Sequence, residues 1–371
     1  MIMRKNFFEN IKQWHEFDFG SAFDKVTEKD IVRALQTDSP ADNDLIALIS
    51  PQADKYLEII AQKAHKLTLR HFGRTIQFYT PLYVSDYCDN VCVYCGFNAH
   101  LSISRSRLDF DQVETEAKKI SDRGFRHVLL LTGDSREKSP VAYIKSCVEI
   151  LCRYFSSVSI EVYALEEDEY ADLILSGVDG LTIYQETYDR GLYDRMHACG
   201  PKKDYSFRLL APERGARAGM RQINIGALFG LDNWRKELFF LAIHARFLQD
   251  KFTAVELGVS LPRLCPEAGG FRPLCSVADR DFVHMITALR VFLPRVGITI
   301  STREHSSLRE NIIPLGVTRF SADSSTVVGG HSAGQDKNSQ FAIADLRSLN
   351  EMKAVLKKYN YQPVLHDWMT I

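Results

Sequence analysis

Short apolar runs alternate with helix-like segments along most of this 371-residue chain, and this alternation restricts the fold more than any other feature. The runs are rich in β-branched and aromatic residues and span 75–84, 127–131, 158–163, 180–184, 222–228, 254–260, 297–301 and 317–322. Strands that alternate with helices in this way form parallel sheets, and eight such strands close a (β/α)8 barrel. The sequence therefore predicts an α/β fold, a TIM-type barrel.

The predicted barrel has a helical segment before it and a helical extension after it. Residues 1–74 have helical periodicity, the barrel takes residues 75–325, and residues 326–371 are expected to pack on it as a helix and tail. An open, doubly wound sheet is the structural alternative. The chain has no G-x-G-x-x-G motif after the first apolar run, which makes this alternative the weaker one.

Several expected helices carry signals at their ends. Thr27 is a candidate N-cap in the helical segment, and Asp109 with Gln112 has the spacing of a capping box. Ser276 and Asp279 take the same two positions before a later helix. We therefore expect helices to begin directly after Thr27, Asp109 and Ser276.

Composition excludes several classes of partner and compartment. The net charge is −1, and Lys and Arg are spread along the chain, which argues against nucleic acid or a membrane surface as partner. The N-terminal residues lack the apolar core of a secretory signal, and no apolar run reaches the length of a membrane-spanning helix. We expect a cytoplasmic protein, in which eight cysteines do not form a disulfide framework.

Reactive side chains follow seven of the eight apolar runs. In a barrel of this type the active site lies at the carboxyl ends of the strands, so these side chains are expected to meet at one rim. Besides three cysteines after the first run, they are Asp134, Glu161, Gln185, Glu186, Arg263, Arg303, Glu304 and Ser321.

Three cysteines, Cys88, Cys92 and Cys95, lie in one loop with the spacing C-x3-C-x2-C. Structural zinc sites prefer C-x2-C pairs with a fourth ligand nearby, and the nearest downstream histidine, His100, has no second pair beside it. Electron-transfer clusters normally have four thiolates. Three thiolates leave one iron of a [4Fe-4S] cluster open, and an open position on a metal is where a substrate or cofactor binds.

This loop, with Tyr94 directly before its third cysteine, resembles the cluster loop of the radical S-adenosylmethionine (SAM) superfamily. Further segments resemble one branch of it, the 2-iminoacetate synthases, which are the tyrosine lyases of thiamine biosynthesis. These segments are 184–189, 200–214, 223–237, 301–304, 328–332 and 361–368. The resemblance covers nearly the whole chain.

The resemblance implies both cofactors and a reaction. The open iron of the cluster is chelated by the amino and carboxylate groups of SAM, and an electron from a flavodoxin- or ferredoxin-type reductant cleaves SAM to methionine and a 5′-deoxyadenosyl radical. This radical takes a hydrogen atom from the amino group of L-tyrosine. The Cα–Cβ bond then breaks, which gives 2-iminoacetate and p-cresol. Thiazole synthase, which receives the 2-iminoacetate, is an implied partner.

The resemblance also implies roles for single residues. Cys88, Cys92 and Cys95 are the cluster ligands. Arg303 is expected to bind the substrate carboxylate through its two-pronged guanidinium, with Ser321 near the substrate amino group. The implied SAM contacts are Tyr94, Thr132, Gly133, Asp134, Glu161, Gln185 and Glu186.

Four departures from the family pattern leave the exact substrate open. Asp134 replaces a Glu, Ala164 a Pro and Cys265 an Arg, and His305 to Leu308 replace a bulkier aromatic segment. They bear on the SAM contacts and on the substrate pocket. A tryptophan-cleaving relative, the hydrogenase-maturation tyrosine lyase and a non-catalytic iron-sulfur paralogue remain as alternatives. The second of these carries further cysteines near its C-terminus, whereas no cysteine follows Cys275 here.

Overall fold

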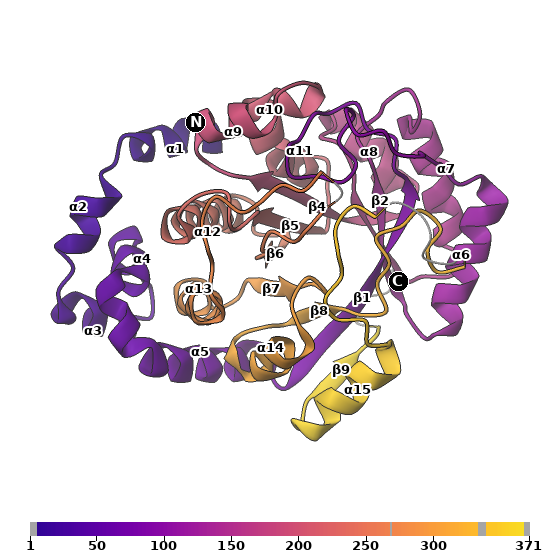
Figure 1. Ribbon diagram of the computed structural model, residues 1–371. Coiled ribbons are helices and arrows are strands. Elements are labelled where there is room, and N and C mark those ends of the chain that lie inside the picture. The colour runs from indigo at the N-terminus through magenta and orange to yellow at the C-terminus, as the bar shows by residue number, and fades with distance from the viewer. Residues whose placement is uncertain (1–5, 268, 333–338, 367–371) are drawn as a thin grey trace.

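The computed structural model describes residues 6–267, 269–332 and 339–366, and a closed barrel of parallel strands is its central feature (Figure 1). The strands in these ranges are β1 (Thr75–Ser85), β2 (His127–Thr132), β3 (Ser157–Glu161), β4 (Val178–Glu186), β5 (Gln222–Ala227), β6 (Glu256–Ser260), β7 (Gly297–Ile300), β8 (Arg319–Ser321) and β9 (Gln362–Val364). Strands β2 to β8 are neighbours in chain order, and β1 pairs with both β8 and β2. The predicted eight-stranded barrel is therefore confirmed.

Helices surround the barrel and precede it. Those before β1 are α1 (Phe7–His15), α2 (Phe19–Asp24), α3 (Glu28–Gln36), α4 (Asp42–Ile49), η1 (Pro51–Tyr56) and α5 (Leu57–Phe72). Those between β1 and β6 are α6 (Phe110–Asp122), α7 (Val141–Leu151), α8 (Glu167–Leu175), α9 (Arg190–Met196), η2 (Pro201–Lys203), α10 (Tyr205–Leu209), α11 (Ala211–Arg217) and α12 (Trp234–Lys251). The later ones are α13 (Asp279–Phe292), α14 (Ser306–Asn311), η3 (Ile313–Leu315) and α15 (Leu349–Lys358).

The five N-terminal helices form an arc outside α12 and α13, on the left in Figure 1. The ring of Phe7 stacks on His244 of α12 with 4.0 Å between centroids, and the guanidinium of Arg235 lies 3.0 Å from Asp54. Thr27 caps α3 as predicted, because its hydroxyl accepts the N–H of the third helical residue. His284 of α13 also lies 3.1 Å from Asp54, so the segment before the barrel is helical, as the sequence indicates, and is fixed to two barrel helices.

Of the two capping boxes predicted for helices of the barrel, the structure confirms one. At α6 the side chain of Asp109 accepts the N–H of Gln112 at 2.8 Å, which confirms that box. The prediction at Ser276 is wrong. The helix begins three residues later, at Asp279, and the carboxylate of Asp281 accepts the N–H of the residue before the helix at 3.0 Å. Asp279 itself binds the arginine that follows β6 and so does not serve as the third residue of a box.

A ninth strand extends the sheet beyond the predicted barrel. In β1, Thr80 is opposite the second residue of β2, so the first residues of β1 have an edge that β2 does not cover. Strand β9 pairs with this edge, with Thr75 opposite Gln362. Unpaired edges are usually covered in this way. The C-terminal extension, predicted as helical, therefore contains a helix, α15, and a strand, and the three-part division of the chain stays a prediction.

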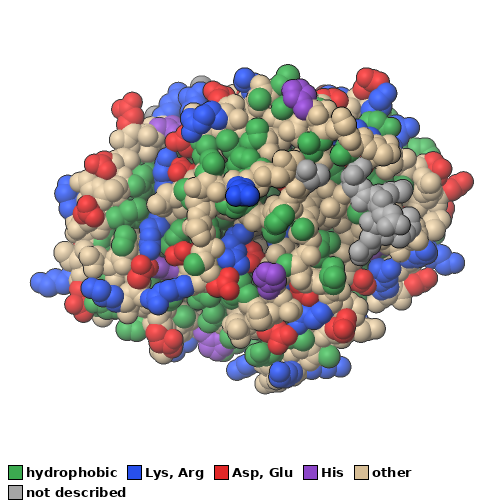
Figure 2. Space-filling model, viewed as in Figure 1, with side chains coloured by type: hydrophobic (Ala, Val, Ile, Leu, Met, Phe, Trp, Pro, Cys, Tyr) green, Lys and Arg blue, Asp and Glu red, His purple; other side chains and the backbone are tan. Residues whose placement is uncertain are grey.

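Charge is mixed over the surface. Figure 2 shows Lys and Arg side chains interspersed with Asp and Glu over the face that it presents. Among the helices of the described ranges, none is long and apolar enough to cross a membrane. The main core is one large cluster of buried side chains from the strands of the barrel and the inner faces of the helices around it, and a second, small cluster includes Cys92 and Tyr94.

Candidate functional site

The loop that carries the three cysteines follows β1 at the carboxyl ends of the strands, and a single arginine holds both of its ends together. The guanidinium of Arg105 donates to the carbonyl oxygens of Asp86, Phe97 and Asn98 at 2.6, 3.1 and 2.7 Å. One guanidinium group that binds three backbone carbonyls therefore joins the two ends of the cysteine loop through hydrogen bonds within the protein. Sequence reasoning did not identify this arginine.

The three thiols fit an iron-sulfur cluster as a donor set. Cys92 is buried, while Cys88 and Cys95 are partly exposed. Burial raises the pKa of all three thiols, that of Cys88 to about 12 with a smaller contribution from the charge of Asp134. Iron binds such groups as thiolates and removes their protons. Among the described residues, no three His, Cys, Asp or Glu side chains surround a single point as the ligands of one metal ion would.

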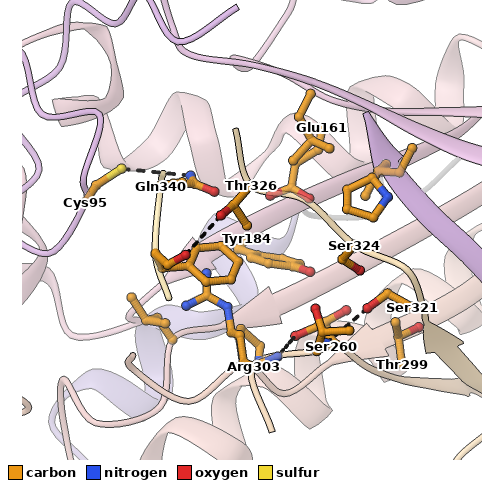
Figure 3. A pocket seen from close by; sticks show the side chains of 18 of the residues that line it. Cys95, Glu161, Tyr184, Ser260, Thr299, Arg303, Ser321, Ser324, Thr326 and Gln340 are labelled. Carbon is orange, nitrogen blue, oxygen red and sulfur yellow. Dashed lines mark hydrogen bonds between the residues drawn. The ribbon is translucent and has the colours of Figure 1, made fainter. Parts of the chain in front are cut away.

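A cavity occupies the barrel mouth beside the third cysteine (Figure 3). It lies among side chains from the ends of several strands and from the segment after β8. Of the residues predicted for the site, those that line it are Tyr94, Cys95, Glu161, Glu186, Arg303 and Ser321. The structure thus brings one cysteine, two carboxylates and one arginine to the same space.

Glu161, at the end of β3, is the carboxyl group without a protein partner in this cavity. Its carboxylate makes no hydrogen bond within the described parts of the chain. Burial raises its pKa to about 7, and the nearby charge of Glu186 contributes to the shift. A carboxyl group that titrates near neutral pH can either accept a hydrogen bond from a bound ligand or donate one to it.

Glu186 is held by two cations that sequence reasoning did not single out. Its carboxylate lies 2.6 Å from Lys202 Nζ and 3.8 Å from the guanidinium of Arg208. Burial alone would raise the pKa of Glu186, but these two charges keep it below its usual value. Its φ of 69° lies in the left-handed region, which a residue other than glycine adopts only when its surroundings enforce it. Both cations lie in the segment 200–214, which carries part of the family resemblance.

The irregular backbone of β4 at Glu186 leaves Gln185 outside the cavity. The pairing of β4 with β5 shifts register between Tyr184 and Glu186, so these two side chains line the cavity and Gln185 does not. Both polar atoms of the Gln185 amide are buried and have no hydrogen-bond partner within the described residues. Its role as a SAM contact stays a prediction, and the geometry gives it no support.

The turn after β2 carries three further predicted residues. The N–H of Gly133 donates to the carbonyl of Ser85 at 2.8 Å, and a Cβ at this glycine would lie 2.3 Å from the carbonyl oxygen of Tyr87. Only glycine therefore allows this approach of the two loops. The hydroxyl of Thr132 is buried and has no partner among the described residues, and Asp134 accepts a hydrogen bond from Asn90 at 2.8 Å.

Asp134 lies in a second cavity next to the first. Ala164 lines this cavity too, together with Arg208, and Lys202 lines both cavities and so connects them. Two of the four departures from the family pattern, Asp134 and Ala164, therefore lie beside the main cavity and not inside it.

The other two departures lie in a third cavity. Cys265 and His305 line it, as does Arg303, which also lines the cavity beside Cys95. The thiol of Cys265 donates to the carbonyl of Arg303 at 3.8 Å. A change at Cys265 can therefore act on the main cavity through Arg303.

Of the two arginines predicted at the ends of the strands, Arg303 is the one whose guanidinium can bind a ligand. Its guanidinium carbon lies 3.3 Å from the ring centroid of Phe341, and no carboxylate in the described ranges pairs with it. Arg263, in contrast, is bound to Glu304 and to an aspartate at 2.9 Å. Ser321 accepts the N–H of Thr302 at 3.0 Å, which fixes its hydroxyl at the cavity wall.

Tyr94 is fixed by a histidine that the sequence did not single out. His197 donates from Nδ1 to the carbonyl of Tyr193 at 2.8 Å, so its Nε2 accepts the hydroxyl proton of Tyr94 at 2.7 Å. Burial lowers the pKa of His197 to about 3, and the charge of Lys202 contributes. The imidazole is therefore neutral near pH 7, as this arrangement requires.

Residues 339–345, which we call the strap, cross the barrel mouth. The strap is bound to the loops after three strands, because Gly96 donates to the carbonyl of Gln340 at 3.1 Å, Ala342 to that of Pro266 at 3.0 Å and Ala344 to that of Thr302 at 2.9 Å. Gln340 and Phe341 line the cavity. The C-terminal part of the chain thus supplies one wall of the site.

Comparisons with known proteins agree with this architecture. Residues 82–242 match the model of the Radical SAM superfamily, and residues 260–362 match that of the Biotin and Thiamin Synthesis associated domain. The chain is 39% identical over 360 residues to the 2-iminoacetate synthase of Escherichia coli K12, with 96% of each chain covered. The chain belongs to the 2-iminoacetate synthase family. It is a radical SAM enzyme, and its family implies a [4Fe-4S] cluster and SAM as cofactors.

One further relative supports this membership, and one solved structure shares the fold. The 2-iminoacetate synthase of Salmonella typhimurium LT2 is 38% identical over 365 residues, with 98% of this chain and 97% of the relative covered. Among solved structures, HydG, a maturase of the [FeFe]-hydrogenase, matches with a TM-score of 0.89 and 28% identity. That match covers 96% of this chain and 80% of HydG. The fold of nearly the whole chain is therefore shared with HydG.

Proposed function

We propose that this protein is a tyrosine lyase, a carbon-carbon lyase that cleaves the Cα–Cβ bond of L-tyrosine to 2-iminoacetate and p-cresol, with SAM consumed to 5′-deoxyadenosine and methionine. The observation that carries the proposal is the match to 2-iminoacetate synthases over nearly the whole chain. The cavity supports it, because it places a cysteine of the cluster loop and an arginine without a carboxylate partner in one space.

In this proposal Cys88, Cys92 and Cys95 hold the [4Fe-4S] cluster. When bound, the cluster and SAM supply a carbon-centred radical that removes a hydrogen atom from the substrate. Lys202 lines both cavities and Arg208 lines the second one, and both offer positive charge to a ligand carboxylate. Without a ligand, the positive charges of Lys202 and Arg208 balance the negative charge of the Glu186 carboxylate. Tyr94, the Thr132–Asp134 turn, Glu161 and Glu186 remain the proposed SAM contacts.

Arg303 and Ser321 are the proposed substrate contacts. The guanidinium lies over the ring of Phe341, which restrains it and leaves its N–H groups for a bidentate carboxylate. Ser321 lies on the same wall of the cavity (Figure 3). A substrate amino acid held by both residues has its Cα–Cβ bond inside the barrel, where side chains exclude water from a radical intermediate.

The partners follow from the family and are part of this proposal. L-Tyrosine is the substrate, a flavodoxin- or ferredoxin-type protein is the reductant, and thiazole synthase receives the 2-iminoacetate. A cytoplasmic location is consistent with a reaction that requires reduced iron and sulfur.

The deciding experiment is a product assay. The protein is reconstituted anaerobically with iron and sulfide and supplied with dithionite, SAM and L-tyrosine. We expect p-cresol together with 5′-deoxyadenosine. Release of 5′-deoxyadenosine with tryptophan but not with tyrosine would assign the protein to the tryptophan-cleaving alternative. No 5′-deoxyadenosine with any aromatic amino acid would refute the enzyme assignment.

A matched pair of variants tests the substrate contact. Arg303→Lys keeps the charge but loses the two-pronged geometry, so we expect KM for tyrosine to rise about tenfold or more. Arg70→Lys makes the same change at an exposed position on α5 and should leave KM unchanged. An unaltered KM in Arg303→Lys would remove this arginine from substrate binding.

A further inference from the structure

The strap brings a side-chain amide to the third cysteine of the loop. Nε2 of Gln340 lies 3.8 Å from Cys95 Sγ, a distance that fits an N–H···S hydrogen bond. The N–H of Phe97 approaches the same sulfur at 3.5 Å. A side chain from the strap, after the last barrel strand, therefore contacts a sulfur of the loop that follows the first strand.

The direction of the Gln340 amide is fixed by Tyr83. The hydroxyl of Tyr83 donates to Oε1 of Gln340 at 2.7 Å, so the oxygen end of the amide is occupied and its NH2 group faces Cys95. A thiolate carries no proton and can only accept hydrogen bonds. The NH2 group of Gln340 is therefore a suitable hydrogen-bond donor to Cys95 when this cysteine is a metal-bound thiolate.

The close approach of the strap depends on Gly96. The N–H of this residue donates to the carbonyl of Gln340 at 3.1 Å. A Cβ at Gly96 would lie 2.6 Å from the carbonyl oxygen of Ser339 and 2.7 Å from that of Gln340. On its other side, Gln340 donates its N–H to the carbonyl of Thr326 at 3.2 Å. The backbone of Gln340 is thus held from two sides, and its side chain has little freedom to leave the sulfur.

We propose that Gln340 is a positioning residue for the cluster, which donates a hydrogen bond to the Cys95 thiolate and raises the reduction potential of the cluster. The inference rests on the proposed function, because it takes Cys95 as a cluster ligand. Hydrogen bonds to cluster sulfurs stabilise the reduced state, which carries the additional negative charge. Tyr83 strengthens the effect, since a donor to the amide oxygen polarises the amide N–H.

The test measures the potential and needs no turnover. The full chain is reconstituted anaerobically, and the reduced cluster is followed by electron paramagnetic resonance during a redox titration. Gln340→Met keeps the length of the side chain and removes the donor. We expect its midpoint to fall by about 59 mV, which is a tenfold lower ratio of reduced to oxidised cluster at a fixed solution potential. Gln340→Glu places a negative charge beside the sulfur, and its midpoint should fall further.

The control is Gln362→Met, the same substitution at an exposed residue on β9, which should keep the midpoint of the unmodified protein. Full iron content with an unchanged midpoint in both Gln340 variants would overturn the proposal. If neither of these variants retains iron, Tyr83→Phe decides, because it removes the hydroxyl that directs the amide NH2 of Gln340 to Cys95: a lowered midpoint supports the proposal and an unchanged one overturns it.

Failure of the proposed function has a different signature. An unmodified chain that binds no cluster, or that holds a cluster but releases no 5′-deoxyadenosine, would contradict the function. An unmodified chain that is active, with variants whose potential does not change, would contradict only the role of Gln340.

Discussion

We expect Arg309→Met to lower the free energy of unfolding by about 3–5 kcal/mol, the usual cost of removing one partner from a buried ion pair. Arg309 on α14 pairs with Asp345 at the end of the strap, and both side chains are 0% exposed. The guanidinium also donates to the carbonyl of Ser321. Removing it leaves that carbonyl without this donor, and Asp345 then keeps Arg347, at 2.7 Å, as its charged partner.

The charge state of Asp345 explains the size of the loss. Burial alone would raise its pKa, but the hydrogen bond from Arg347 and the positive charge of Arg309 hold the pKa below its usual value. The carboxylate is therefore ionised at neutral pH and remains buried in the variant. Asp345→Asn leaves the guanidinium buried instead and should cost a similar amount. The double variant should lose about 1–3 kcal/mol less than the sum of the two single losses, because the two groups are coupled.

Urea unfolding of the reconstituted protein under argon, followed by circular dichroism, measures these losses. With an m value of about 3 kcal/mol per M, a loss of about 3–5 kcal/mol lowers the midpoint by about 1–1.7 M. Lys12→Met is the control, since it removes a pair with Glu9 in which the side chains are 53% and 44% exposed. It should change the stability by less than about 1 kcal/mol. Losses below about 1 kcal/mol for Arg309→Met, or strictly additive single losses, would refute this reasoning.

Three further predictions concern other parts of the molecule. Burial raises the pKa of Glu237 to about 8, against an ordinary value of 4.5, so its contribution to stability is fully present below pH 4.5 and is lost as the pH rises through 8. Glu237→Gln should remove about 2–3 kcal/mol of the loss in unfolding free energy between pH 6 and pH 9, and an identical pH profile would contradict the raised pKa of Glu237. Gly96→Ala should cost about 1–3 kcal/mol in urea unfolding by forcing the strap outward, whereas Gly20→Ala, whose Cβ would come no closer than 3.4 Å to its surroundings, should be neutral or stabilising. Cys92→Ala should lose the visible absorption of the cluster and all SAM cleavage, while Cys199→Ala at an exposed thiol retains both; turnover in the first variant would show that Cys92 is not a ligand.

The barrel could be predicted from the sequence because its signal is local and repeated. Each apolar run became a strand, and the carboxyl ends of parallel strands meet at one rim by geometry alone. This is why Glu161, Arg303 and Ser321, which are far apart in the chain, were correctly expected to lie close together. Strand β9 was missed because it consists of three residues and depends on an edge of β1 that only the assembled barrel exposes.

Details that depend on a single contact could not be predicted. A register shift in β4 decides that Glu186 and not Gln185 lines the cavity, and no residue pattern marks this shift. Lys202 and Arg208 belong to a segment with many charges, where position alone does not identify the two that lie at the cavity. Gln340 contacts a cysteine 245 residues earlier, and a glutamine in a polar segment gives no signal of this.

That separation of 245 residues has a consequence for the way the site is made. On a ribosome that adds about 5–20 residues per second, the third cysteine is synthesised roughly 12–50 s before Gln340. Strands β2 to β8 are synthesised in the same interval, so until it ends neither the complete barrel nor the strap can cover the thiols of the loop. The order of synthesis thus leaves a period in which the cluster that we propose for this loop can enter before the strap covers it. It also sets the time for which the nascent enzyme most needs protection from oxygen.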